Sequence, residues 1–126
     1  MSLMTWAYIS DASHGKSIYE INHSSELGNL LFWDIRKAVE DERPNTKQLD
    51  WYLWEWKMSK AEMVEFLSQD KYKTKERHSS IINWTFEDGS KIEYDLYENA
   101  YIEEALDFVN KLPDTQDYYL VAYDDS

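Results

Sequence analysis

Two aromatic runs constrain the fold of this chain more than any other feature of its sequence. Residues 50–56 read Asp-Trp-Tyr-Leu-Trp-Glu-Trp, and residues 117–123 read Asp-Tyr-Tyr-Leu-Val-Ala-Tyr. Each run comes shortly after a proline, in Pro-Asn-Thr at residues 44–46 and in Pro-Asp-Thr at residues 113–115. Aromatic residues favour strands, and proline ends a preceding helix. The two runs therefore suggest one structural unit that is used twice.

The first half of the chain, residues 4–58, shows the order strand, strand, helix, strand. β-Branched and aromatic residues predict strands at residues 5–9 and 17–21. Apolar residues recur at intervals of three and four across residues 27–39, which predicts a helix. Residues 50–57 fit a helix or a strand, but three tryptophans and a tyrosine favour the strand.

The linking segment, residues 59–79, contains a helix signal and a polar stretch. Ser59 and Glu62 have the spacing of a capping box, which predicts a short helix. Residues 70–78 are rich in lysine and predict a solvated connector.

The second half, residues 80–124, repeats the order of the first. Apolar and polar residues alternate on both sides of Asp88 and Gly89, a dipeptide typical of a tight hairpin. A helix is expected at residues 102–112 and a last strand at residues 118–123. The chain is thus predicted to be a single α+β domain, residues 1–126, with about six strands and three helices. Two ββαβ units joined by a helix would give this order, although low identity between the halves leaves coincidence open.

The net charge of −12 is concentrated in the last third of the chain. Residues 87–126 hold 12 acidic and two basic residues, a net charge of −10, whereas the other 86 residues hold 13 acidic and 11 basic ones. Such a surface repels nucleic-acid phosphates and attracts cations. We therefore expect a basic protein partner and no nucleic acid, with a merely solubilising surface as the plainer alternative.

The composition also limits the compartment. The chain has no cysteine, no run of about 18 apolar residues and no signal-peptide pattern at its N-terminus. We expect a cytoplasmic protein without disulfides that does not bind membranes.

No strong catalytic or metal-binding motif is present. His14, His23 and His78 lie far apart, and Asp11 with His14 makes only a weak acid–base or metal pair. There is no nucleophile elbow and no glycine-rich phosphate loop. We expect neither a cofactor nor a metal, and a binding protein rather than an enzyme.

Carboxylates of the second half are the main candidates for a functional site. Glu103 and Asp107 lie one helical turn apart, Glu104 is beside them, and Glu98 precedes the helix. Two acids on one helix face could bind a hard cation or act as an acid–base pair. The solvated face of an amphipathic helix explains them more simply.

Three tryptophans in residues 50–56 suggest a second kind of site. Trp51, Trp54 and Trp56 could stack on a sugar, a base or a cation, although most of them should lie in the core. If Trp51 faces solvent, it would suit a binding surface.

These features favour a small protein-binding module, such as an inhibitor, an immunity-type neutraliser or a nucleic-acid mimic. Glu98, Glu103, Glu104 and Asp107 would contact a basic partner, and Trp51 would anchor it. One alternative is a small-molecule binder or enzyme with an aromatic-lined pocket. Another is a self-associating module, a homodimer in which an edge strand such as the Trp51 strand pairs with its copy.

Overall fold

The main feature of the fold is a five-stranded antiparallel sheet. The computed structural model describes residues 5–21, 26–73, 78–98 and 102–124. Its fold is α+β, as the sequence predicts, and the sheet has the strand order β2-β1-β7-β4-β3. The strands are β1 (Thr5–Ser10), β2 (Ser17–Ile21), β3 (Thr46–Asp50), β4 (Leu53–Ser59) and β7 (Asp117–Asp124).

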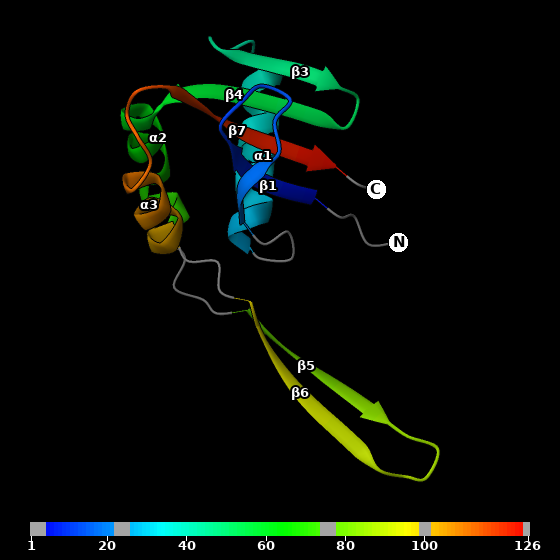
Figure 1. The fold of residues 1–126 in the computed structure, drawn as a ribbon. Helices are drawn as coiled ribbons and strands as arrows, with labels where there is room; N and C mark the ends of the chain where they lie inside the picture. The colour runs from blue at the N-terminus through cyan, green and yellow to red at the C-terminus, as the bar shows by residue number, and fades with distance from the viewer. Residues whose placement is uncertain (1–4, 22–25, 74–77, 99–101, 125–126) are drawn as a thin grey trace.

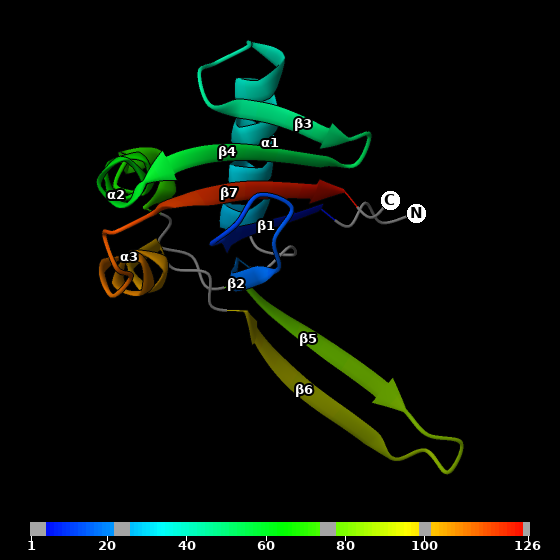
Figure 2. The same ribbon diagram turned by 45° about the horizontal axis from the view of Figure 1, so that its top comes forward.

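The α-helices of the described residues cover one face of this sheet. Helix α1 (Glu26–Glu40) crosses behind β1, β7 and β4, and α2 (Lys60–Leu67) lies beside α3 (Ile102–Asn110) at one end of the sheet (Figures 1 and 2). In the part of the chain that is described, no helix is both long and apolar enough to cross a membrane.

The apolar stripe of α1 forms the centre of the core. Leu27, Leu31 and Ile35 are almost completely buried, together with Ala7 of β1 and Leu120 of β7. Burying a large aliphatic side chain completely contributes roughly 1.5–3 kcal/mol. The stripe therefore decides which face of the sheet the helix covers, and the opposite face is left without a helix in the described residues.

Residues 50–57 do not form the single strand that the sequence predicts. Residues Thr46–Asp50 form β3, which pairs with β4 in a hairpin, and Trp51 and Tyr52 lie in the turn. The backbone N–H of Trp51 donates to the side chain of Asp50 at 2.7 Å. Aspartate favours turns through such local bonds, which here outweigh the strand preference of the aromatic residues. The strand after Trp51 is consequently interior, and β2 and β3 are the edges of the sheet.

The hairpin of the second half forms as predicted but remains separate from the main sheet. Strands β5 (His78–Thr85) and β6 (Lys91–Glu98) pair with each other in a two-stranded sheet that extends away from the rest (Figure 1). Gly89 has φ of 88°, a conformation that favours glycine. The elements follow the order of two ββαβ units with β3 added, yet only the first ββ pair joins the five-stranded sheet.

The segment after β4 begins as predicted and then departs from expectation. The Ser59 Oγ accepts the N–H of Glu62, and the Glu62 carboxylate accepts the N–H of Ser59, each at 3.1 Å, so the capping box is confirmed. The connector that follows is not entirely solvated, because residues Asp70–Tyr72 form a 3-10 turn in which Tyr72 is fully buried. Its hydroxyl donates to Asp34 of α1 at 2.5 Å.

Candidate functional site on the uncovered face of the sheet

A row of five paired residues, four of them polar or charged, crosses the sheet face opposite the helices. The register pairs Glu20 of β2 with Tyr8 of β1, Tyr8 with Val121 of β7, and Val121 with Glu55 of β4. Lys47 of β3 completes the row. Directly paired residues share a face of a sheet. The row therefore places one carboxylate on each side of Tyr8.

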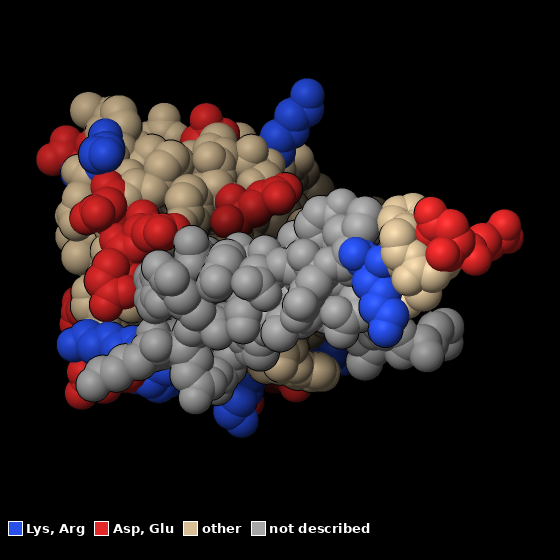
Figure 3. Space-filling view, turned by 90° about the horizontal axis from the view of Figure 1, so that it is seen from below, with Lys and Arg blue, Asp and Glu red and all other residues tan. Residues whose placement is uncertain are grey.

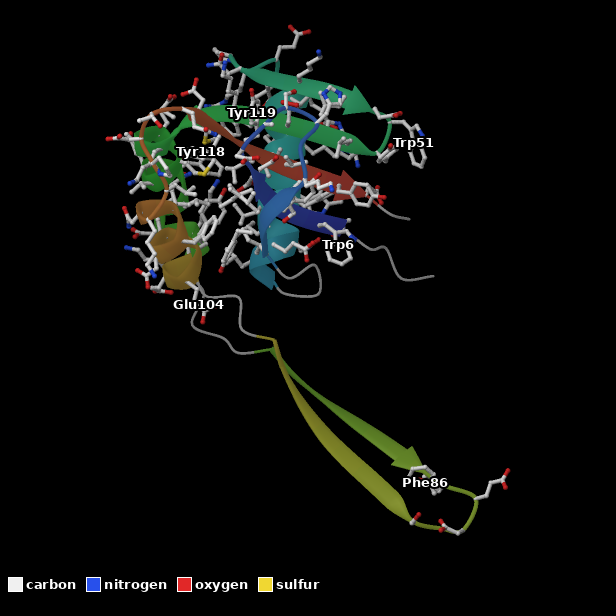
Figure 4. All side chains as sticks on the ribbon, viewed as in Figure 1. Trp6, Trp51, Phe86, Glu104, Tyr118 and Tyr119 are labelled. Atoms are coloured by element: carbon white, nitrogen blue, oxygen red, sulfur yellow. The ribbon has the colours of Figure 1, made fainter. Side chains whose placement is uncertain are left out.

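Aromatic side chains form a second row next to the first. The register pairs Trp6 with Tyr123. The Tyr123 ring packs edge-on against Tyr52 with centroids 5.4 Å apart, and Tyr52 packs against Trp51 at 5.1 Å. Edge-to-face contacts of this kind stabilise each ring in its orientation. We call Trp6, Tyr8, Tyr52, Tyr123 and Trp51 the aromatic strip. Figure 4 shows Trp6 and Trp51 at the same end of the sheet.

A hollow of about 350 Å³ opens on this face at β1, β2 and the end of β7. Its volume is at the lower end of the range for small-ligand pockets. It is therefore suited to a small group, such as one side chain of a partner, rather than to a large cofactor. Three residues of the aromatic strip line it together with charged and small residues: Trp6, Tyr8, Tyr123, Lys16, Glu20 and Ser17.

The β1–β2 loop, residues 11–16, crosses the same face in front of β7 and β4 (Figure 1). The Ser13 Oγ lies 2.6 and 2.9 Å from the two carboxylate oxygens of Glu55 and donates to this group, which is only 4% exposed. A Cβ at Gly15 would lie 2.5 Å from the Oγ of Ser10, closer than atoms pack. Glycine therefore permits the close approach of loop and strand, and Ser13 supplies a donor to a buried carboxylate.

The electrostatic potential around Tyr8 is negative. Burial raises the pKa of the Tyr8 hydroxyl above its ordinary value, and the neighbouring Tyr123, Glu55 and Glu20 raise it further. Aromatic ring faces attract positive charge, and carboxylates form strong charge-assisted hydrogen bonds with cationic donors. The uncovered face therefore has the chemistry of a site for a cationic group.

The carboxylates that the sequence singles out on α3 lie on its exposed side. Glu103, Glu104 and Asp107 are exposed, and no ion pair involves them among the described residues. In the view from below, acidic side chains gather on the α3 side of the folded body (Figure 3). The side chain of Glu98, at the end of β6, lies outside the described residues. The opposite side of the helix is buried through Ile102, Ala105 and Val109.

The structure separates the three tryptophans of residues 50–56. Trp51 is 70% exposed in the turn. Trp54 is 4% exposed and lies in the core, where the guanidinium of Arg36 stands 4.8 Å from its ring centroid. Trp56 is half-buried against Phe66, with centroids 4.9 Å apart. Figure 4 places Trp51 and Glu104 at opposite ends of the five-stranded sheet, so these two candidate residues do not form one patch.

A larger hollow of about 590 Å³ lies between α1 and α2. Trp56, Met58 and Phe66 contribute apolar surface to it, and charged residues of both signs surround them. One of its lysines, Lys71, is paired with Asp34 at 3.0 Å. Because its charges are mixed and partly paired, this hollow specifies the chemistry of a ligand less clearly than the uncovered face does.

The histidine candidates do not assemble into a site within the described residues. His14 is exposed, has φ of 56°, and its Nδ1 lies 3.4 Å from the Oγ of Ser13. His23 and the side chain of His78 lie outside the described part of the chain. Where side chains are described, no group of three or more His, Asp or Glu residues could hold a metal ion.

Sequence reasoning does not identify Glu55 or Tyr8 as candidates, although a signal for one of them exists. Glu55 stands between Trp54 and Trp56, so strand alternation places it on the face away from the tryptophans. Its burial depends on a loop that comes 42 residues earlier in the chain, and no local pattern contains that contact.

Two surfaces thus have the character of binding sites. The uncovered sheet face offers aromatic rings, a hollow and carboxylates, and the outer side of α3 offers exposed acids. Searches of protein-family models, curated protein sequences and solved structures find no match to the chain.

Proposed function

We propose that the chain is a protein-binding module that engages a basic partner through the exposed acidic side of α3. The observation that carries the proposal is the exposure of Glu103, Glu104 and Asp107 without an ion pair among the described residues. Asp34 and Glu40 of α1 differ in this respect, because they pair with Lys71 at 3.0 Å and with Arg36 at 3.2 Å. The negative charge of acids without such partners is not neutralised locally, so it attracts a positively charged surface.

The charge of the surrounding chain supports the same partner class. Residues 87–126, which include α3, carry 12 acidic and two basic residues. A partner that itself binds nucleic acid would present the required basic surface, so the module would act as an inhibitor, an immunity-type neutraliser or a nucleic-acid mimic. We place the protein in the cytoplasm, because a chain without cysteine cannot form the disulfides that an oxidising compartment favours.

The test begins with capture of the partner from a lysate of the source organism, followed by elution with salt. The association rate of the purified pair is then measured with the variant that combines Glu103→Lys, Glu104→Lys and Asp107→Lys. We expect the association rate at low salt to fall about tenfold, and its salt dependence to become weaker, because the attraction that steers the encounter is reversed.

A matched control changes the net charge by the same amount at exposed acids outside residues 87–126, through Asp11→Lys, Glu42→Lys and Glu65→Lys. We expect this control to retain most of the association rate, since its charges do not lie on α3. An unchanged association rate in the α3 variant, or an equal loss in the control, would contradict the proposal.

A further inference from the structure

We infer that the hollow lined by Trp6, Tyr8 and Tyr123 on the uncovered sheet face is a binding site for the guanidinium group of an arginine, with Glu20 as its counter-ion. The inference rests on the proposed function for its biological occupant, an arginine side chain that projects from the basic partner. The site itself is defined by geometry and charge, so it can be tested with a small arginine peptide in the absence of any partner.

The shape of the site fits one planar side-chain group. The hollow of about 350 Å³ lies where the paired residues Trp6 and Tyr123 adjoin Tyr8, which is two residues from Trp6 on the same face of β1. Contact of Tyr123 with Tyr52, at 5.4 Å between centroids, holds one wall of the hollow in place. A guanidinium that enters is therefore met by aromatic surfaces that are already oriented.

The charge of the site favours a cation. Glu20 lines the hollow, and Glu55 lies three strands from Glu20, or two from Tyr8, in the same cross-strand row. Lys16 also lines the hollow and opposes a cation, and Lys47 is paired with Glu55 in the row. Both lysines are exposed, as Glu20 is, whereas Glu55 is buried. A buried charge is screened less by solvent than an exposed one. Solvent therefore weakens the two ammonium groups more than it weakens the buried Glu55 carboxylate.

The choice of guanidinium over ammonium follows from the combination of flat rings and a carboxylate. Guanidinium is planar, stacks on aromatic faces and donates two parallel hydrogen bonds to a carboxylate, whereas ammonium is compact and strongly hydrated. The protein already uses this chemistry internally, because the guanidinium of Arg36 lies 5.2 Å from the ring centroid of Trp33 and 4.8 Å from that of Trp54.

The site is continuous with the acidic side of α3 around the edge strand β2. On the helix-covered face of the sheet, the ring of Tyr19 stacks on Phe108 of α3 with centroids 4.8 Å apart. Glu104 lies close enough to Tyr19 to raise its pKa, although burial is the larger cause. Glu20 is the next residue and points to the opposite face. One basic partner that covers the β2 edge would therefore contact both surfaces.

The experiment titrates the full chain with acetyl-Gly-Arg-Gly-amide and follows its ¹H–¹⁵N spectrum. We expect saturable shifts of the Trp6 indole signal and of the backbone amides of residues 8, 20 and 123. The same peptide with citrulline, which is uncharged and nearly the same shape, should bind at least tenfold more weakly. The lysine peptide should also bind more weakly, since ammonium lacks the planar contact.

Variants localise the effect without disturbing the core. Glu20→Gln is expected to weaken the arginine peptide roughly threefold, in line with one partly exposed ion pair, and Lys16→Gln to strengthen it slightly. Glu65→Gln, at an exposed site on α2, is the matched control and should change nothing. Equal binding of the citrulline or lysine peptide, an unchanged affinity in Glu20→Gln, or the absence of saturable shifts would overturn the inference.

The two proposals fail separately. The α3 charge-reversal variant should still bind the arginine peptide with near-normal affinity, because Glu103, Glu104 and Asp107 do not line the hollow. If the arginine site is confirmed but the α3 charge-reversal variant associates with the partner at the wild-type rate, the proposed function fails and the site remains. If α3 governs association while the peptide does not bind, the site fails and the proposed function remains.

Discussion

At the scale of single residues, Tyr72 shows how one side chain decides the structure of a polar segment. It lies between Lys71 and Lys73 in a stretch whose composition predicts a solvated connector. The structure buries it completely, and its hydroxyl donates to Asp34, which also pairs with Lys71 at 3.0 Å. Burial raises the pKa of Tyr72 far above its ordinary value, and the hydrogen bond with Asp34 raises it further.

We predict that Tyr72→Phe lowers the free energy of unfolding by about 1 kcal/mol near neutral pH, because Asp34 loses a hydrogen bond. In the unfolded chain a tyrosine ionises near pH 10, whereas the folded protein keeps Tyr72 protonated. Above pH 10 this residue should therefore cost the wild type about 1.4 kcal/mol per pH unit, a loss that the phenylalanine variant lacks.

Urea denaturation of both proteins between pH 8 and pH 11.5 measures the effect. Tyr8 and Tyr19, whose pKa values are also raised, remain in both proteins and cancel in the comparison. The stability difference should shrink above pH 10 and then change sign. A difference that is constant with pH would show that Tyr72 does not behave as described.

At the scale of elements, local pattern predicts the strands and helices, and contacts between elements explain what it misses. The α1 stripe, the capping box at Ser59 and the turn at Gly89 are all visible within a few residues of sequence. The turn at Trp51 cannot be recognised from local sequence, because β3 becomes a strand only through its pairing with β4. The aromatic strip is invisible for the same reason, since Trp6 and Tyr123 meet across 117 residues.

The contact between the β1–β2 loop and β4 leads to a second prediction. Ser13→Ala should lower the free energy of unfolding by about 1–3 kcal/mol, because the buried Glu55 carboxylate loses a hydrogen-bond donor. In a Glu55→Gln background the same change should cost less, since a neutral amide is cheaper to leave unsatisfied than a charge.

Thermal and urea denaturation of the four proteins of this cycle give the coupling energy between Ser13 and Glu55. Ser68→Ala is a suitable comparison, because the Ser68 hydroxyl, just after the end of α2, donates to the carbonyl of Val64 in that helix and bridges no distant elements. It should change stability by less than about 0.5 kcal/mol. Additive effects of Ser13→Ala and Glu55→Gln would argue against the contact.

At the scale of the whole molecule, the fold divides into a layered body and a projecting hairpin. The body consists of the five-stranded sheet and the helices on one of its faces, whereas β5 and β6 pair only with each other (Figure 2). The proposed binding surfaces, on α3 and on the uncovered face, both belong to the body. Two-stranded sheets have little stability of their own in water.

We therefore predict that replacing residues 78–98 by a short glycine–serine linker leaves the body folded. The cooperative thermal transition should remain, with a shift in melting temperature of only a few degrees, because the described core lies in the sheet and helices. Circular dichroism and the dispersion of the ¹H–¹⁵N spectrum provide the measurement. Loss of the transition would mean that the hairpin supports the body.

The position of β7 in the sheet has a consequence for synthesis. It is the middle strand of five but follows the other four in sequence, and β1 and β4 touch it rather than each other. During synthesis, helix α1 can contact both flanking hairpins before β7 is made, but the strand that joins the hairpins into one sheet comes last of the five. Each nascent hairpin meanwhile presents an unsatisfied edge, which invites misassembly. Completion of the five-stranded sheet thus depends on the eight residues of β7.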